Sequence, residues 1–274
     1  MDLIESHVHI WTIRDPRFGR HPESDFTPDI EAAPADLFRA QDEVGGVAWT
    51  VLIQPRYYLW DNSYLIQAAE AYPDRLVVAG RVDPLLPDAA DALRELMRHR
   101  QLRGIRLAPN TDPQIRWLDE PSQDPLWETA ADTNATIGLL INWRQLPQAN
   151  AMAARHPDVT VVIDHLGSPD YRDPDSLTNL LALSEQANVF VKLSGYPNGT
   201  RAAYPYSEAH SLIERVYRAY GSKRLMWGTD WPVCLTSATY KEAFDSAWNL
   251  PFLGDADREW IFAHTAKRAW RIER

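Results

Sequence analysis

Short apolar runs recur along the chain at fairly even spacing, and segments with a helical pattern of apolar positions separate them. Most of these runs are continuously apolar and do not alternate with polar residues. Such runs are typical of parallel strands that helices cover on both faces. We therefore predict eight strands, at residues 3–10, 48–55, 76–83, 104–108, 136–142, 159–165, 189–194 and 225–230.

The helical pattern predicts helices at residues 34–44, 62–72, 87–100, 124–133, 145–155, 175–187, 207–220, 239–248 and 255–270. Strands that alternate with helices form a parallel sheet, and eight such units favour an α/β fold of the (β/α)8 TIM barrel type, with residues 1–274 as a single domain. Six strands would instead indicate an open, doubly wound sheet. A G-x-G-x-x-G motif, which would support that alternative, does not follow the first strand.

The longest irregular stretch, residues 11–33, contains several prolines and follows the first strand. In a barrel it would lie over the mouth. Loops of this length are often lids or binding loops, although a surface loop without a role fits the sequence equally well.

Polar residues stand where the predicted strands end, and this is the end of a (β/α)8 barrel at which active sites form. His7 and His9 are two positions apart on a strand, so both imidazoles point to the same face. Asp230, at the end of the eighth predicted strand, could close a three-ligand site with them. Two histidines and one aspartate can hold a divalent metal or organise a water molecule for hydrolysis.

Each candidate also has a plainer interpretation. A pair of histidines on a strand is a weak signal alone, and it gains weight from Asp230. His165 could hydrogen-bond at the barrel rim, although we favour a functional role for it. Arg106 could form a structural ion pair or a bidentate clamp for an anionic substrate. For Lys192 we favour an ion pair inside the barrel over a Schiff base, and for Cys234 a buried thiol over a nucleophile.

Composition narrows the range of partners. The chain has 28 Lys and Arg against 38 Asp and Glu, a net charge of −10, and no basic block, which argues against binding to nucleic acid or an anionic membrane surface. No apolar run is long enough to span a membrane. The single cysteine and the acidic residues and histidines at the N-terminus lead us to expect a cytoplasmic protein. Eleven tryptophans suit a pocket lined with aromatic rings.

Four motifs at the strand ends resemble those of the amidohydrolase superfamily, and more narrowly its amidohydrolase-related branch. They are His7-x-His9, Asp164-His165-x-Gly167-x-Pro169, Lys192-Leu193-Ser194-Gly195 and Gly228-Thr229-Asp230-Trp231-Pro232. The resemblance covers essentially the whole chain. It implies a (β/α)8 barrel that hydrolyses a cyclic ester, the lactone of a sugar acid or of an intermediate in aromatic degradation.

The chain also departs from metal-rich members of that superfamily, which carry a carbamylated lysine or a glutamate on strand 4 and a histidine on strand 5. Here those positions hold Arg106 and Asn142. The resemblance thus implies at most one divalent metal, most simply zinc held by His7, His9 and Asp230. It also allows no metal at all, because the branch includes metal-independent lactonases.

In the mechanism that we expect, Asp230 is the general base, and His165 stabilises the oxyanion or protonates the leaving alkoxide. The substrate is a small carboxylated or polyhydroxylated lactone, and assembly of several copies is compatible with the sequence. Two alternatives remain: a zinc-dependent decarboxylase of an aromatic acid, which Asn142 disfavours, and a non-catalytic barrel that binds a sugar acid. We expect four residues to bind the substrate: Arg106, Gln54, Tyr57 and Asn142.

Overall fold

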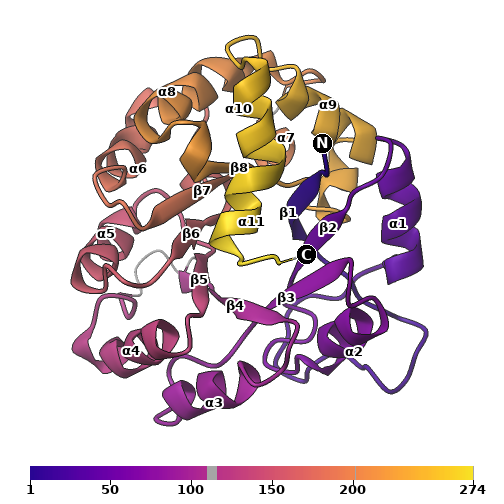
Figure 1. Ribbon diagram of the computed structural model, residues 1–274, viewed down its shortest axis with the longest axis vertical. Coiled ribbons are helices and arrows are strands. Elements are labelled where there is room, and N and C mark those ends of the chain that lie inside the picture. Colours follow the sequence, from indigo (N-terminus) through magenta and orange to yellow (C-terminus); the bar gives the residue numbers. More distant parts are fainter. Residues whose placement is uncertain (110–115, 201, 274) are drawn as a thin grey trace.

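The computed structural model describes residues 1–109, 116–200 and 202–273. Within them, eight parallel strands follow one another around a barrel in the order of the sequence, as Figure 1 shows. This confirms the predicted (β/α)8 fold. The strands are β1 (Ile4–Val8), β2 (Trp49–Ile53), β3 (Leu76–Gly80), β4 (Leu102–Leu107), β5 (Thr136–Leu139), β6 (Val161–Ile163), β7 (Val189–Leu193) and β8 (Leu225–Trp227).

The barrel closes between β1 and β8, just beyond the end of β8. Val8 forms a parallel bridge with Trp231. The backbone N–H of His9 donates to the carbonyl of Trp231 at 2.7 Å, and the N–H of Asp230 donates to the carbonyl of His7 at 2.9 Å. A Cβ atom at Gly228 would lie 2.7 Å from the Cβ of His7, so only glycine allows the two segments to approach this closely. His7, His9 and Asp230 thus lie on the seam that closes the barrel.

Helices surround the barrel, and most are shorter than the pattern predicted. They are α1 (Pro34–Asp42), α2 (Ser63–Ala71), α3 (Ala89–Leu96), α4 (Asp124–Asp132), α5 (Leu146–Arg155), α6 (Thr178–Leu183), α7 (Tyr196–Gly199), α8 (His210–Tyr220), α9 (Tyr240–Trp248), α10 (Asp255–Glu259) and α11 (Thr265–Ala269).

Three differences from the predicted helices have local causes. Residues 97–100 form turns that lead into β4, so α3 ends early. The predicted helix 175–187 begins as a 3₁₀ turn, Pro174–Leu177, in front of α6. A π-helical turn, Trp260–His264, separates α10 from α11. The short helix α7 was not predicted, because a single turn leaves no periodic pattern in the sequence.

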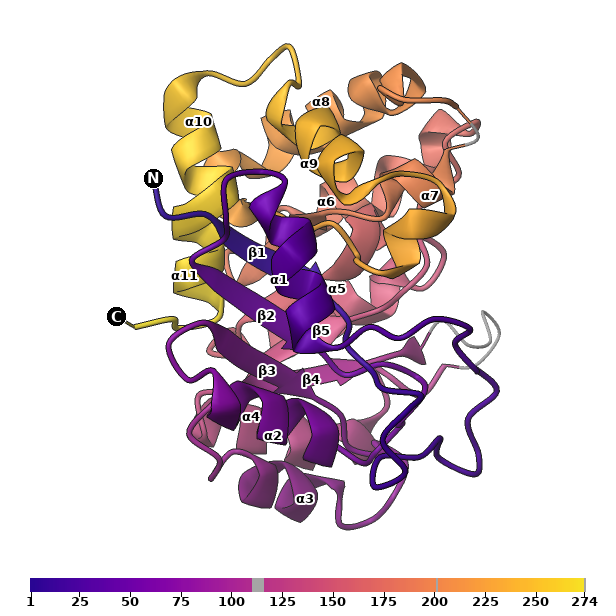
Figure 2. The same ribbon diagram turned by 90° about the vertical axis from the view of Figure 1, so that its right-hand side faces the viewer.

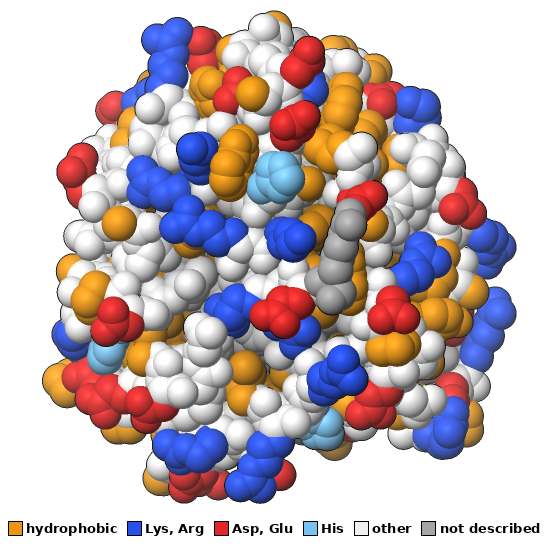
Figure 3. Space-filling view, in the orientation of Figure 1, with side chains coloured by type: hydrophobic (Ala, Val, Ile, Leu, Met, Phe, Trp, Pro, Cys, Tyr) orange, Lys and Arg blue, Asp and Glu red, His pale blue; other side chains and the backbone are white. Residues whose placement is uncertain are grey.

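The amino-terminal end of the barrel is plugged by α11, which crosses it in Figure 1. Trp270, just beyond α11, is fully buried and belongs to a cluster with side chains that point into the barrel, among them Ile4, Val77, Val162 and Met226. Around the plug, the surface carries acidic and basic side chains mixed together, as Figure 3 shows. This end of the barrel is therefore closed by apolar packing, which leaves the opposite end for a site.

The segment of residues 11–33 lies at that opposite end, away from α11, as Figure 2 shows. Trp11 bridges Ala32, and its indole N–H donates to the carbonyl of Ile30 at 2.8 Å. The N–H of Thr12 donates to the hydroxyl of Tyr58 at 2.9 Å, which ties the segment to the loop after β2. The predicted position over the barrel mouth is confirmed. Among the described residues, no helix has the length and apolar character needed to cross a membrane.

Candidate active site

Three ligand atoms converge at the seam between β1 and β8. The Nε2 atoms of His7 and His9 are 3.3 Å apart, and Oδ1 of Asp230 lies 3.4 Å from each of them. A tetrahedral zinc ion with bonds of about 2.0–2.1 Å needs ligand atoms about 3.3–3.4 Å apart, so this triangle fits one ion. Oδ1 of Asp230 is buried and has no hydrogen-bond partner among the described residues. The donor set predicted from the sequence is therefore brought together in a geometry suited to a divalent metal.

The second nitrogen of His9 fixes how this ring is protonated. Nδ1 lies 2.7 Å from the carbonyl oxygen of Ile53, and only an N–H can donate to a carbonyl. The proton is therefore on Nδ1, and the lone pair of Nε2 faces the triangle. A backbone carbonyl in this position is a common support for a metal-binding histidine.

The second nitrogen of His7 faces a buried group of charges. Its Nδ1 lies 3.1 Å from Nζ of Lys192 and 3.4 Å from Oδ1 of Asp164. Asp164 is paired with Lys192 at 3.0 Å and with Nε of Arg106 at 2.9 Å, and all four side chains are buried. The ion pair predicted for Lys192 is confirmed. Arg106 also takes part in an ion pair, through its Nε atom.

Burial and charge shift the pKa values of this group in opposite directions. Burial lowers the pKa of His7 well below 6.5, and the nearby Lys192 lowers it further. Burial also lowers the pKa of Lys192, to about 8, although Asp164 opposes this shift. For Asp164 burial acts to raise the pKa, but Lys192, His7 and Arg106 outweigh it and hold the pKa well below its usual value. At neutral pH His7 is neutral and Asp164 is ionised.

Asp230 is held in an unusual backbone conformation. Its φ angle of 64° lies in the left-handed region, which residues other than glycine seldom adopt. Burial acts to raise its pKa, but His165, His9 and His7 outweigh this effect and lower it, so the carboxylate stays ionised. The charged carboxylate of Asp230 thus lies beside three imidazole rings.

A buried glutamate that the sequence analysis missed anchors the residue before Asp230. Oε1 of Glu5 accepts hydrogen bonds from the backbone N–H and the hydroxyl of Thr229. Oε2 accepts from the hydroxyl of Tyr240 at 2.6 Å and from the amide of Gln41 at 3.0 Å. Glu5 stands two positions before His7 on the same strand, and this spacing is the signal that could have revealed it.

His165 completes the group from the end of β6. Its Nε2 lies 3.9 Å from Oδ2 of Asp230, and its Nδ1 lies 2.9 Å from the hydroxyl of Ser194. His165 has a φ of 53°, and a Cβ atom at Gly195 would lie 2.6 Å from its Nδ1, so glycine is needed there. Burial lowers the pKa of His165 below 6.5. The ring is therefore neutral at pH 7 and faces Asp230.

A cavity of about 250 Å3 opens beside these groups. Trp11 and Phe26, which come from the segment 11–33, form one wall, with ring centroids 5.5 Å apart. Sequence reasoning did not single out these two rings, because the path of a long loop is not encoded in a periodic pattern. The full lining consists of His9, Trp11, Phe26, Pro55, Arg56, Arg106, Leu140, His165, Asp230 and Val233.

Three of the four predicted substrate-binding residues do not line this cavity. The amide of Gln54 donates to the carbonyls of Leu59 and Asp61, at 3.3 and 2.6 Å. Tyr57 is buried, with its ring 4.7 Å from that of Tyr58. The amide of Asn142 donates to Oε1 of Gln145 at 2.8 Å. These side chains shape the loops after β2 and β5, and a direct contact with substrate stays a prediction for them.

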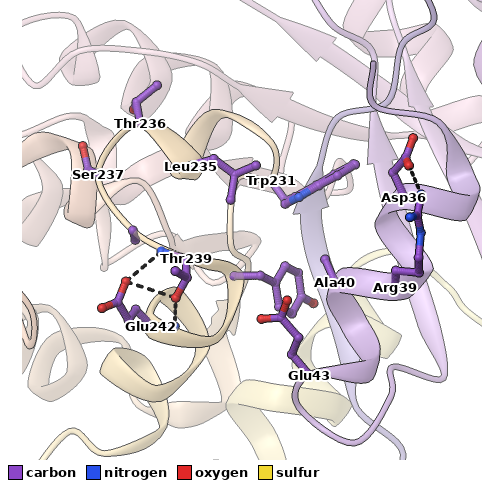
Figure 4. A pocket seen from close by; sticks show the side chains of 12 residues that line it. Asp36, Arg39, Ala40, Glu43, Trp231, Leu235, Thr236, Ser237, Thr239 and Glu242 are labelled. Carbon is purple, nitrogen blue, oxygen red and sulfur yellow. Dashed lines mark hydrogen bonds and ion pairs between the residues drawn. The ribbon is translucent and has the colours of Figure 1, made fainter. Parts of the chain in front are cut away.

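Cys234 and a second hollow lie close to the seam but outside this group. Cys234 is buried, as predicted, and burial raises the pKa of its thiol. A larger hollow, of about 720 Å3, lies between α1 and the start of α9 (Figure 4). Three of its charged side chains have partners nearby, since Arg39 pairs with Asp36 and Glu242 accepts from Thr239. None of the histidines discussed above lines it, so we assign the chemistry to the smaller cavity.

Comparison with known proteins agrees with this geometry. An L-fucono-1,5-lactonase of Burkholderia ambifaria is 29% identical, and the match covers 99% of this chain and 96% of the relative. A 2-pyrone-4,6-dicarboxylate hydrolase of Comamonas testosteroni is 26% identical over 84% of this chain and 76% of the relative. A 4-sulfomuconolactone hydrolase of Rhizobium radiobacter is 26% identical over 83% of this chain and 75% of the relative.

Solved structures share the fold. An amidohydrolase from Burkholderia multivorans, crystallised with bound zinc, has a TM-score of 0.85 at 22% identity, with both chains covered completely. A 5-carboxyvanillate decarboxylase from Sphingomonas paucimobilis has a TM-score of 0.69 at 16% identity, with 99% of each chain covered. The family model described as amidohydrolase matches residues 4–272, so the chain belongs to the amidohydrolase family.

Proposed function

We propose that this protein is a lactonase, which hydrolyses the cyclic ester of a small organic acid. The observation that carries the proposal is the buried oxygen of Asp230, which faces two imidazole nitrogens at the edge of a cavity. Relatives that match most or nearly all of the chain support it, because their names describe hydrolysis of lactone rings.

His7, His9 and Asp230 would hold one divalent metal, for which zinc is the first choice given two nitrogen ligands and one oxygen ligand. When bound, the metal would supply a Lewis acid and lower the pKa of water. A second group, His7, Asp164 and His165, also has three potential ligand atoms close together. Lys192 and Arg106 already neutralise its carboxylate, so it is the weaker candidate.

Asp230 acts as the general base. Its carboxylate is ionised at neutral pH, and it lines the cavity in which an attacking water would stand. A proton taken from that water passes to a carboxylate oxygen while the water oxygen attacks the ester carbonyl. A positioned carboxylate in this role contributes about 10²–10⁴-fold to the rate.

His165 supplies the N–H that the oxyanion or the leaving alkoxide needs. When the hydroxyl of Ser194 donates to Nδ1 at 2.9 Å, the proton of the neutral ring is on Nε2. This N–H faces the cavity beside Asp230 and can donate to the developing oxyanion or to the leaving alkoxide. Asp164 and Lys192 orient His7 from behind and take no direct part in the reaction.

The test is a panel of sugar-acid and aromatic-acid lactones, with hydrolysis followed as acid release, before and after treatment with a chelator. We expect turnover of at least one lactone, and about one equivalent of metal per chain by elemental analysis. Two equivalents after dialysis would contradict the single site. Release of CO2 from an aromatic acid without hydrolysis of any lactone would point to a decarboxylase, and binding without turnover would point to a sugar-acid binding protein.

A further inference from the structure

A second guanidinium is buried near the proposed site, and no ion pair joins it to a carboxylate of the described residues. Arg81 follows β3 directly and is only 6% exposed. Its Nε and Nη1 atoms are buried, and neither has a hydrogen-bond acceptor among the described residues. Buried charges are normally paired, because an isolated charge in a low dielectric is strongly disfavoured. Arg81 therefore requires an explanation that the fold alone does not supply.

Two hydrogen bonds with the side chain of Asn62 hold the backbone of Arg81 in place. The side-chain oxygen of Asn62 accepts from the N–H of Arg81 at 2.8 Å, and the amide of Asn62 donates to the carbonyl of Arg81 at 2.9 Å. A Cβ atom at Gly80 would lie 2.7 Å from that oxygen, so glycine is needed for this clamp. The guanidinium also lies over the ring of Trp60, 4.8 Å from its centroid. The plane of the guanidinium is thus positioned, while Nε and Nη1 have no acceptor among the described residues.

Arg81 lines a cavity of about 240 Å3 that shares a wall with the cavity at Asp230. The shared residue is Arg106, which lines both. The nitrogen of Arg106 that binds Asp164 is Nε, and no partner is found for its two terminal nitrogens among the described residues. The rest of the wall is mostly apolar, with Leu59, Trp60, Val82, Pro84, Leu85, Leu107 and Trp117.

The charged side chains around the cavity at Arg81 are mostly positive. Burial, together with the positive charges of Arg106 and Arg56, lowers the pKa of Arg81 to about 9. Asp83 also lines the cavity and opposes this shift. Its carboxylate accepts from the N–H of Leu85 at 3.0 Å, and no ion pair joins it to Arg81. An anion that entered the cavity would meet two guanidiniums and relieve their mutual repulsion.

We propose that Arg81 and Arg106 form a second pocket, which binds a carboxylate on the lactone while the ester lies at Asp230. Each cavity alone is smaller than the roughly 300–1,000 Å3 of ordinary ligand sites, and the two joined at Arg106 reach that range. A guanidinium that lines the cavity and has no carboxylate partner among the described residues offers charged N–H donors to a carboxylate that enters. The apolar wall fits a flat or hydrocarbon frame better than a polyhydroxylated one. This inference rests on the proposed lactonase function for the identity of the reacting group.

The first test measures binding and needs no turnover. Calorimetry compares benzene-1,3-dicarboxylate, benzoate and neutral benzamide on the metal-loaded protein, its Arg81→Met and Arg81→Lys variants, and Arg75→Met. Arg75 is a matched control, because it precedes the same strand at the opposite end and lies over the ring of Phe38. We expect the Kd of the dicarboxylate to rise about 10- to 150-fold in Arg81→Met, as for loss of a charge-assisted hydrogen bond, and to stay unchanged in Arg75→Met. Arg81→Lys should lie between them.

Thermal unfolding separates a binding role from a structural one. Removal of an unpaired buried charge should leave Arg81→Met at least as stable as the parent protein. A marked loss of stability, with dicarboxylate affinity unchanged in Arg81→Lys, would show that Arg81 supports the fold and would overturn the proposal. Equal loss of affinity for benzamide and for the dicarboxylate would do the same.

The second test measures turnover of a lactone that carries a free carboxylate against its methyl ester. The ratio of kcat/KM for the acid to that for the ester should fall about 10-fold or more in Arg81→Met. An unchanged ratio would overturn the carboxylate pocket while leaving the lactonase function intact. If the parent protein turns over no lactone, the proposed function fails, and the binding measurements decide the pocket independently.

Discussion

Two carboxylates flank His7, and the fold uses them in opposite ways. Asp164 faces Nδ1, is completely buried and has two cations as partners, Lys192 and Arg106. Asp230 faces Nε2, lines the cavity, and among the described residues its carboxylate pairs with histidines alone. The two side chains are of the same type and contact the same ring. Their partners make one a fixed anchor and leave the other with an oxygen available for chemistry.

A negative charge in a site is available for chemistry only when no permanent cation neutralises it. A cation held at 3 Å neutralises the charge of a carboxylate, whereas a neutral imidazole leaves that charge available to a metal or a proton. Loss of Asp230 should therefore appear first in kcat, and loss of Asp164 should appear first in the free energy of unfolding.

The largest effect on activity is expected for Asp230→Asn. Asparagine keeps the shape but cannot take a proton, so kcat should fall at least about 100-fold while the circular dichroism spectrum is unchanged. The variant should also retain less metal, since the amide replaces an anionic ligand. Retention of more than about a tenth of the parent kcat would remove Asp230 from the role of base.

Asp164→Asn should damage stability first. It leaves Lys192 and Arg106 buried without their counter-charge, and breaking a buried ion pair in this way costs about 3–5 kcal/mol. Denaturant unfolding of the parent and the variant measures this difference. The double variant Asp164→Asn with Lys192→Met should recover part of the loss. A change below about 1 kcal/mol would mean that the two carboxylates are less different than the geometry indicates.

Arg106 pairs with Asp164 and also lines the cavity. The Arg106→Lys variant tests whether Arg106 binds the substrate in addition to forming this ion pair. Lysine keeps the charge but loses the planar fork, so kcat/KM for an anionic lactone should fall about 10- to 150-fold. The matched measurement uses the neutral analogue of the same lactone. A similar loss on both substrates would leave Arg106 as an ion-pair residue alone.

The smallest effect is a change in pH dependence. The pKa of Lys192 is about 8, below its usual 10.5, so the folded protein loses this proton above about pH 8, while the unfolded chain keeps it to about pH 10.5. With Lys192 neutral, Asp164 is less neutralised and His7 is less well oriented, so kcat/KM should fall above about pH 8.

Burial lowers the pKa values of His7 and His165, which places the acid limb of this profile below pH 6.5. The alkaline limb should be absent in Lys192→Gln, which has no such proton to lose. An identical alkaline limb in both proteins would assign it to another group.

The sign of the stability change also follows from the lowered pKa of Lys192. Between about pH 8 and pH 10.5 the unfolded state binds more protons at this residue, so its contribution to the free energy of unfolding rises with pH. A titration of stability against pH in the parent and in Lys192→Gln isolates this contribution.

The sequence predicted the barrel and the convergence of two histidines with one aspartate, because both follow from the pattern of the strands. Buried parallel strands are continuous apolar runs, and residues at i and i+2 share a face whatever the rest of the chain does. His7, His9 and Asp230 therefore converge as expected. Glu5 lies on the same strand and would have needed only one further step along the same periodicity.

Other residues could not be placed, because their positions depend on turns. Gln54, Tyr57 and Asn142 stand at or just after strand ends, as predicted, yet the direction of a side chain beyond a strand is set by the loop that follows. Trp11 and Phe26 reach the cavity through the path of a long segment. His165 and Asp230 adopt left-handed backbone conformations, which no hydrophobic pattern announces.

The seam between β1 and β8 has a consequence for protein synthesis. His7 and His9 leave the ribosome with β1, but Asp230 and the backbone groups that hold it follow only after β1 to β7 have been made. Contacts so distant in sequence form late in folding. A nascent or truncated chain that ends before β8 would expose the unpaired edges of β1 and β7, a hazard for aggregation, and would have no hydrolytic activity. Activity therefore appears only when the last strand joins the first.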